Sequence, residues 1–159
     1  MKKRTKKIAL TGIAVLMCVF LFGMAIHYIN IKKSIWGTMG IDSVNDIDKV
    51  QLAQQDFRAE ELLAKSDRIR LFYILSTTRK YDKTKDKTYV LNGSFLSYPI
   101  VHFEVDGEKQ EIYWEYETGI IHYGGIEEKS VKYYLEEENA AELKELYEKY
   151  IDLRGVSRQ

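Results

Sequence analysis

The stretch Val101-His-Phe-Glu-Val-Asp-Gly-Glu-Lys-Gln-Glu-Ile-Tyr-Trp-Glu-Tyr116 decides the fold of this 159-residue chain. Its Asp106-Gly107 pair accepts the positive φ angles of a two-residue type I′ turn, and apolar residues alternate with polar ones on both sides. The sequence therefore predicts an antiparallel hairpin with one apolar and one polar face. The loop length fixes the register of three pairs: Val101 with Ile112, His102 with Glu111, and Glu104 with Lys109.

Two further strands are expected to extend the hairpin into a meander. Gly119 precedes a short apolar run at 120–123, and Gly124-Gly125 turns the chain into alternating residues over 131–135. Before the hairpin, residues 46–52 suit a first strand. Residues 58–65 stay open, because they fit either a strand paired with the first one or a helix.

Two helices are expected to bury the apolar face of this sheet. Apolar residues recur at helical spacing over 67–80, behind Ser66 or Asp67 as the cap and with Arg79 and Lys80 in the last turn. A terminal helix begins at Asn139, which forms a capping-box variant with Glu142, and Gly155 is expected to end it. The prediction is an α+β domain over 46–153: a small antiparallel sheet packed by two helices on one face.

The N-terminal region predicts a membrane anchor. Residues 1–7 carry five cationic side chains, and residues 8–29 form an uncharged apolar run. Twenty-two helical residues cover about 33 Å, enough to cross a hydrocarbon core of about 30 Å. The excess of basic residues before the run predicts a cytoplasmic N-terminus and a C-terminal part outside. A signal peptide cleaved after Ala25 is the alternative.

Residues 30–45 are expected to form a linker between the membrane and the domain, since Gly37 and Gly40 lie in a stretch with little periodicity. Tyr28 and Trp36 suit the outer membrane interface, where aromatic rings gather. At the other end, residues 154–159 are expected to form a C-terminal tail.

Charge and cysteine content narrow the classes of function. Residues 34–159 hold 17 basic and 24 acidic side chains, a net charge of −7, which disfavours nucleic acid as a partner. The single cysteine, Cys18, lies in the apolar run, so the outer domain has no disulfide and no catalytic thiol. The sequence also lacks the nucleophile-elbow, Walker A, zinc-protease and EF-hand motifs, so we expect no enzyme and no cofactor.

The order of these elements resembles a group of uncharacterised small extracytoplasmic domains of Gram-positive bacteria, which are lipoproteins or signal-anchored proteins. The resemblance spans residues 46–153 and implies the fold and the location, without catalytic residues. Its residues are Lys49-Val-Gln-Leu, Asp67-Arg-Ile, Asp106-Gly107 and Val131-Lys-Tyr-Tyr-Leu.

Three residues are candidates for a metal site. His102 and Glu104 share a strand face, and His122 lies two strands away, so two imidazoles and a carboxylate are placed to converge. Glu111, opposite His102, would complete the site or orient the ring. The alternative is that all of them are ordinary polar residues on the solvent face.

The chain has 12 tyrosines, several of them in the expected strands. Most are expected to pack across strands. Tyr113 and Tyr134 fall on the face opposite their apolar neighbours, so they form a candidate binding face for a protein or a glycan.

The sequence favours a membrane-anchored extracytoplasmic binding or accessory module of the bacterial cell envelope. Its partners would be the membrane, through residues 8–29, and an envelope protein or polymer. A metal-dependent envelope enzyme at His102, His122 and a carboxylate is one alternative. A self-protection protein that shields its host from a secreted toxin is another. The oligomeric state stays open.

Overall fold

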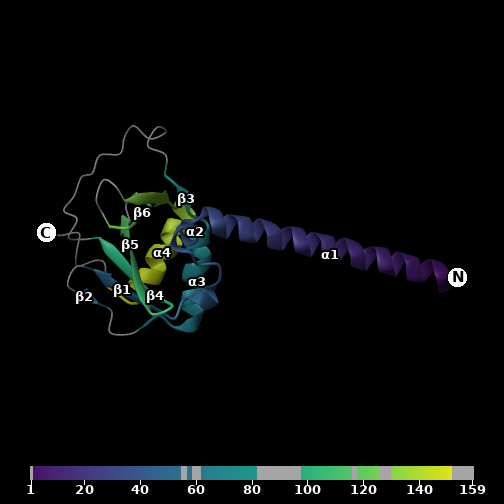
Figure 1. Ribbon diagram of the computed structural model, residues 1–159, viewed down its shortest axis with the longest axis horizontal. Coiled ribbons are helices and arrows are strands. Elements are labelled where there is room, and N and C mark those ends of the chain that lie inside the picture. The colour runs from purple at the N-terminus through teal and green to yellow at the C-terminus, as the bar shows by residue number, and fades with distance from the viewer. Residues whose placement is uncertain are drawn as a thin grey trace.

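A long N-terminal helix, α1 (Lys2–Lys33), projects from a folded α+β domain (Figure 1). The computed structural model describes residues 2–54, 57–58, 62–81, 98–115, 118–125 and 130–151, and their side chains except at 2–11, 54, 57 and 58. The fold class expected from sequence is confirmed: an apolar helix, then an antiparallel sheet packed by helices.

Among the described residues, seven strands form one antiparallel sheet in the order β2-β1-β4-β5-β6-β7-β3. Strands β4 and β5 pair in the register expected from the two-residue loop, with Val101 opposite Ile112. φ is 51° at Asp106 and 77° at Gly107, as a type I′ loop requires. The strands are β1 (Lys49–Gln54), β2 (Phe57–Arg58), β3 (Arg79–Lys80), β4 (Pro99–Val105), β5 (Glu108–Glu115), β6 (Ile120–Tyr123) and β7 (Val131–Tyr134).

The chain passes from α1 into a short helix, α2 (Ile35–Met39), with a single residue between them. The Ser34 hydroxyl donates to the Ile31 carbonyl at 2.7 Å and accepts from the Trp36 amide at 3.3 Å. The backbones of α1 and α2 approach each other so closely here that a Cβ on Gly37 would lie 2.1 Å from the Lys32 carbonyl oxygen. Glycine at 37 is therefore required by this junction.

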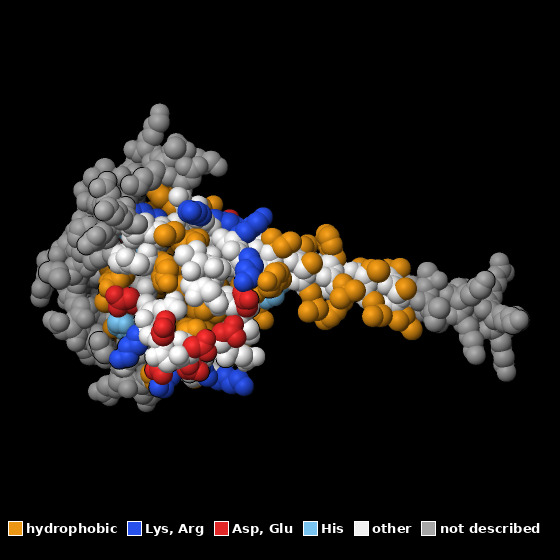
Figure 2. Space-filling model, in the orientation of Figure 1, with side chains coloured by type: hydrophobic (Ala, Val, Ile, Leu, Met, Phe, Trp, Pro, Cys, Tyr) orange, Lys and Arg blue, Asp and Glu red, His pale blue; other side chains and the backbone are white. Residues whose placement is uncertain are grey.

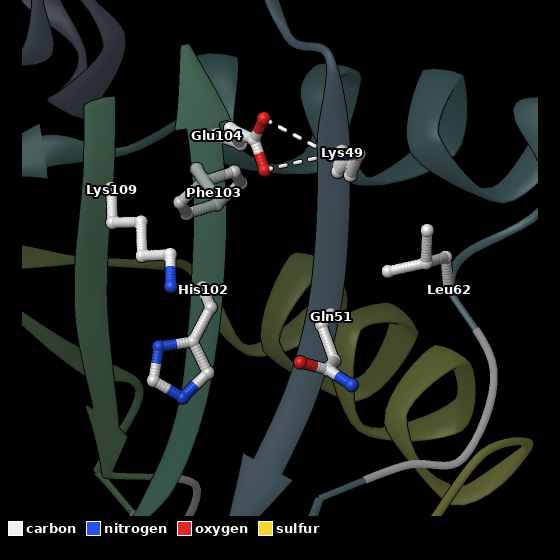
Figure 3. A pocket seen from close by; sticks show the side chains of 7 residues that line it. All are labelled: Lys49, Gln51, Leu62, His102, Phe103, Glu104 and Lys109. Atoms are coloured by element: carbon white, nitrogen blue, oxygen red, sulfur yellow. Dashed lines mark hydrogen bonds and ion pairs between the residues drawn. The ribbon is translucent and has the colours of Figure 1, made fainter. Parts of the chain in front are cut away.

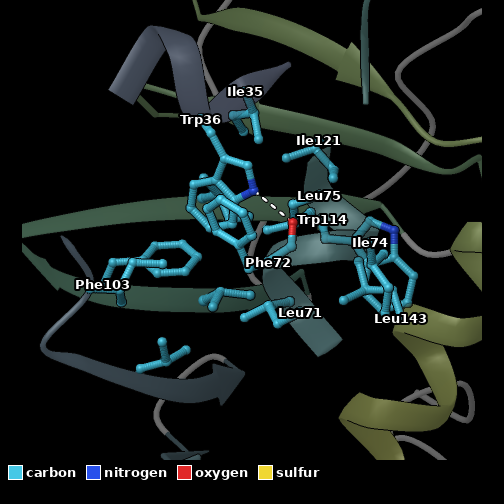
Figure 4. Close-up of a cluster of buried hydrophobic side chains, with 14 of the residues drawn as sticks. Ile35, Trp36, Leu71, Phe72, Ile74, Leu75, Phe103, Trp114, Ile121 and Leu143 are labelled. Atoms are coloured by element: carbon cyan, nitrogen blue, oxygen red, sulfur yellow. Dashed lines mark hydrogen bonds between the residues drawn. The ribbon is translucent and has the colours of Figure 1, made fainter. Parts of the chain in front are cut away.

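Residues 30–45 are not a linker, because several of them lie in the hydrophobic core (Figure 4). The Trp36 side chain is fully buried, stacks on Phe72 at a centroid distance of 5.2 Å, and donates its indole N–H to the Phe72 carbonyl at 2.9 Å. The expectation of Trp36 at the membrane interface is therefore wrong, and the domain begins well before residue 46. The buried hydrophobic residues of this stretch are Ile31, Ile35, Trp36, Met39 and Ile41. A 3₁₀ turn, η1 (Val44–Asp46), leads into β1.

The second long helix, α3 (Lys65–Ser76), begins earlier and ends earlier than expected. Its N-cap is Ala64, without a side-chain hydrogen bond. Asp67, expected as a cap, instead accepts hydrogen bonds from Lys149 and Tyr150. Thr77 and Thr78 end the helix: both are β-branched, and their hydroxyls donate to its last carbonyls. Arg79 and Lys80 then form β3, not the last turn of a helix.

The terminal helix, α4 (Glu137–Glu148), begins two residues before the expected cap. Its N-cap is Glu136, so the capping box at Asn139 is wrong, and it ends well before Gly155, which lies outside the described residues. Leu143, Leu146 and Tyr147 face the core. The Tyr147 hydroxyl hydrogen-bonds to the backbone of Ala53 and Ile100, which joins α4 to the β1 and β4 pair.

Candidate functional site on the open face of the sheet

The helices α2, α3 and α4 pack on the apolar face of the sheet, and part of its other face is open to solvent. Figure 3 looks onto this part with the helices behind the strands. His102 and Gln51 are opposite each other on β4 and β1, and Lys49 is opposite Glu104. We call these polar side chains the open polar face: Lys49, Gln51, His102, Glu104, Lys109 and Glu111.

An ion pair and a histidine–carboxylate contact organise this face. Lys49 Nζ lies 3.0 Å from both carboxylate oxygens of Glu104, and His102 Nδ1 lies 3.5 Å from Glu111 Oε2. Beside them is a groove of about 220 Å³. Leu62, whose side chain is 49% exposed, lies at the edge of the groove and adds an apolar surface. Such a surface can bind a ligand that offers both charges and a small apolar group.

The three candidate metal ligands lie on one side of the sheet but bind different partners. Glu104 contacts Lys49, His102 contacts Glu111, and His122 contacts Glu115 on β5. Among the residues that the structure describes, no three histidine, cysteine, aspartate or glutamate side chains form a group that could hold a metal ion. The metal hypothesis thus gains no support from the described part of the chain.

A second polar cluster surrounds His122, whose side chain is fully buried. His122 Nε2 lies 2.5 Å from Glu115 Oε1, and Nδ1 lies 3.2 Å from the Ser130 hydroxyl. Thr118 donates to the second Glu115 oxygen at 3.0 Å, and the Tyr98 ring stacks on His122 at a centroid distance of 6.3 Å. Sequence spacing gave no sign of this cluster, because it depends on strand pairing and on residues between strands.

Serine, histidine and glutamate are also the residues of an acyl-transfer triad. In such triads the serine contacts Nε2 and the carboxylate contacts Nδ1, whereas here the two contacts are exchanged. We interpret the His122 cluster as structural: it satisfies buried polar atoms and ties β5, β6 and the approach to β7 together.

The two candidate tyrosines share the non-helical side of the sheet, as expected, but differ in their surroundings. Tyr113 is partly buried and donates to Glu111 Oε1 at 2.5 Å. Burial, and then this hydrogen bond, raise the pKa of Tyr113 to about 12. Tyr134 is 37% exposed and lies on β7, opposite Arg79. Tyr113 therefore adjoins the open polar face, whereas Tyr134 lies near the far edge of the sheet.

No protein-family model, curated protein or solved structure matches this chain.

Proposed function

We propose that this protein is a membrane-anchored extracytoplasmic accessory module that binds an envelope partner through the open polar face. The observation that carries the proposal is the placement of this face relative to α1. In Figure 1, α2 and α3 lie on the side of the sheet toward α1, so the opposite face points away from the helix. An anchored domain with this geometry would present its polar surface to the space beyond the membrane.

The properties of α1 support the anchor. The most apolar 18-residue window of Gly12–Lys33 has a mean hydropathy of 2.2, and none of that window is buried inside the protein. Figure 2 shows hydrophobic side chains around this part of α1. A helix of this composition is stable when lipid covers it. The resemblance to signal-anchored extracytoplasmic domains, and the basic residues before the apolar run, support the proposed orientation.

Cleavage after Ala25 is a distinct outcome that the fold tolerates, since Ile31 and the core residues after it would remain. The mass of the mature protein in the membrane fraction separates the two possibilities: the full-length mass supports the anchor.

Neither the metal-dependent enzyme nor the self-protection protein is favoured by a contact among the described residues.

Photo-crosslinking in intact cells tests the binding face. A photoreactive amino acid at Lys109 of the full-length protein is expected to capture one partner repeatedly. The matched control carries it at Glu142, an exposed position on α4. The pair His102→Ala and Tyr113→Phe is expected to weaken the capture at Lys109 without reducing the amount of protein. Equal capture at Lys109 and Glu142 would contradict the proposed face.

A further inference from the structure

An exposed aromatic side chain of the folded domain contacts the apolar helix. Tyr73, on α3, lies against His27 of α1 with a ring centroid distance of 5.9 Å, yet its side chain remains 56% exposed. Outside α1, only two other large hydrophobic residues of the described chain are exposed: Leu62, beside the groove, and Tyr134, on β7. Tyr73 is the one that lies next to the candidate membrane span.

The length of α1 indicates the depth of this contact. His27 lies 20 residues after Lys7, the last basic residue before the apolar run. At a rise of about 1.5 Å per residue they cover about 30 Å, the thickness of the hydrocarbon core. A helix whose inner end is held by Lys7 would therefore place His27 at the outer boundary of the core. Since Tyr73 touches His27, it would lie at the same depth.

The direction of α3 extends this contact over a surface. In Figure 1, α3 lies on the side of the domain where α1 leaves it and runs across the direction of α1. Ser66, Ile69 and Tyr73 recur on one side of α3, and all three are exposed or partly exposed. We call them the outer side of α3. If α1 spans the bilayer, this side runs along the membrane plane.

We propose that the phospholipid headgroup layer covers the outer side of α3, with Tyr73 as an interfacial anchor supplied by the folded domain. This inference rests on the proposed membrane anchor. A tyrosine suits that position because its ring packs against acyl chains while its hydroxyl reaches water and headgroups. The domain is then held against the membrane, with the open polar face directed away from it.

Depth-dependent fluorescence quenching tests this placement in the full-length protein, reconstituted in phosphatidylcholine vesicles. The only cysteine, Cys18, labelled with an environment-sensitive probe, measures insertion of α1. In a Cys18→Ser background, Tyr73→Cys and Ile69→Cys report on the outer side of α3, and Lys109→Cys is the matched control on the open polar face. Ile69→Cys retains Tyr73, so a loss of the aromatic contact does not obscure the result.

The proposal predicts that lipids with a headgroup nitroxide quench the probes at 73 and 69 strongly and the probe at 109 hardly at all. Weak quenching at all three sites, with the Cys18 probe quenched by acyl-chain nitroxides, would overturn the α3 contact and leave the anchor standing. An unquenched Cys18 probe would overturn both proposals.

Discussion

Replacement of Trp36 by alanine tests whether residues 30–45 belong to the domain. The indole is fully buried between Phe72 and Phe103, at centroid distances of 5.2 Å from each ring. Removal of a buried tryptophan costs about 3–5 kcal/mol, from lost burial and the cavity left behind. The Phe72 carbonyl keeps a hydrogen bond from Ser76, so no buried acceptor is left unpaired. Because small domains have about 5–15 kcal/mol of stability, Trp36→Ala is expected to remove a large share of it.

The measurement is urea unfolding of the full-length protein in a mild detergent, followed by the fluorescence of Trp114, which is fully buried and unchanged in the variant. Trp36→Phe keeps most of the ring volume and is expected to lose clearly less than Trp36→Ala. Tyr28→Ala, an exposed aromatic change on α1, is the control that should leave the transition in place. A free energy of unfolding for Trp36→Ala within about 0.5 kcal/mol of the parent, as for a typical surface substitution, would refute the core assignment.

Three further predictions concern other parts of the fold. His122→Ala is expected to lower the free energy of unfolding by about 2 kcal/mol or more in the same assay, because it removes the hydrogen bond between His122 and Glu115 Oε1 inside a buried site. His102→Ala, on the open polar face, should cost clearly less, and equal losses would contradict the structural role of the His122 cluster. Gly37→Ala is expected to lower the free energy of unfolding by about 1–3 kcal/mol in a thermal unfolding experiment, because the added Cβ overlaps the Lys32 carbonyl. Gly23→Ala, which has open space around the site, should be neutral, and equal melting temperatures of the two variants would show that the junction between α1 and α2 is loose. Hydrogen bonds from Lys149 and then Tyr150 lower the pKa of Asp67 below its ordinary 3.8. The ionised carboxylate therefore stabilises the fold above pH 3.8, and this contribution is lost as the pH falls through the lower pKa of the folded state. Asp67→Ala should make the free energy of unfolding fall less steeply at acid pH, and an unchanged slope would count against the prediction.

The central sheet was predictable because its signals are local. Asp106-Gly107 sets the loop, and the alternation on either side then fixes which residues face the core. Val101, Phe103, Ile112 and Trp114 are all buried on the helical side, as the alternation requires. By contrast, β2 and β3 have two residues each, too few to show a period. Strand β3 exists because β7 offers it a partner far along the chain.

Helix boundaries were predicted less well, since a capping side chain has other possible partners. Asp67 suits a cap by residue type, but Lys149 and Tyr150 at the C-terminal end of the neighbouring helix α4 engage its carboxylate. Asn139 lies in the first turn of α4 rather than before it. The residue type of a candidate cap is therefore an incomplete guide to where either helix begins.

The candidate site was predictable only in part. The pairs His102 with Glu111 and Glu104 with Lys109 follow from the hairpin register alone. The contact of Lys49 with Glu104 joins residues 55 positions apart, and the contact of His122 with Ser130 joins residues eight positions apart. These contacts divide the three candidate metal ligands among separate partners, a result that residue types and spacing do not reveal.

The failed linker prediction has the largest consequence for function. Gly37 and Gly40 suggested a flexible tether, but Ile31, Ile35, Trp36 and Met39 recur at intervals of four, one and three, which is the pattern of a helical face. The first glycine permits close packing and the second ends α2 in a left-handed conformation. As a result, the described chain has no long unstructured segment between α1 and the core. If α1 is inserted in a bilayer, the fold itself sets which side of the domain meets the lipid and which side faces away from it.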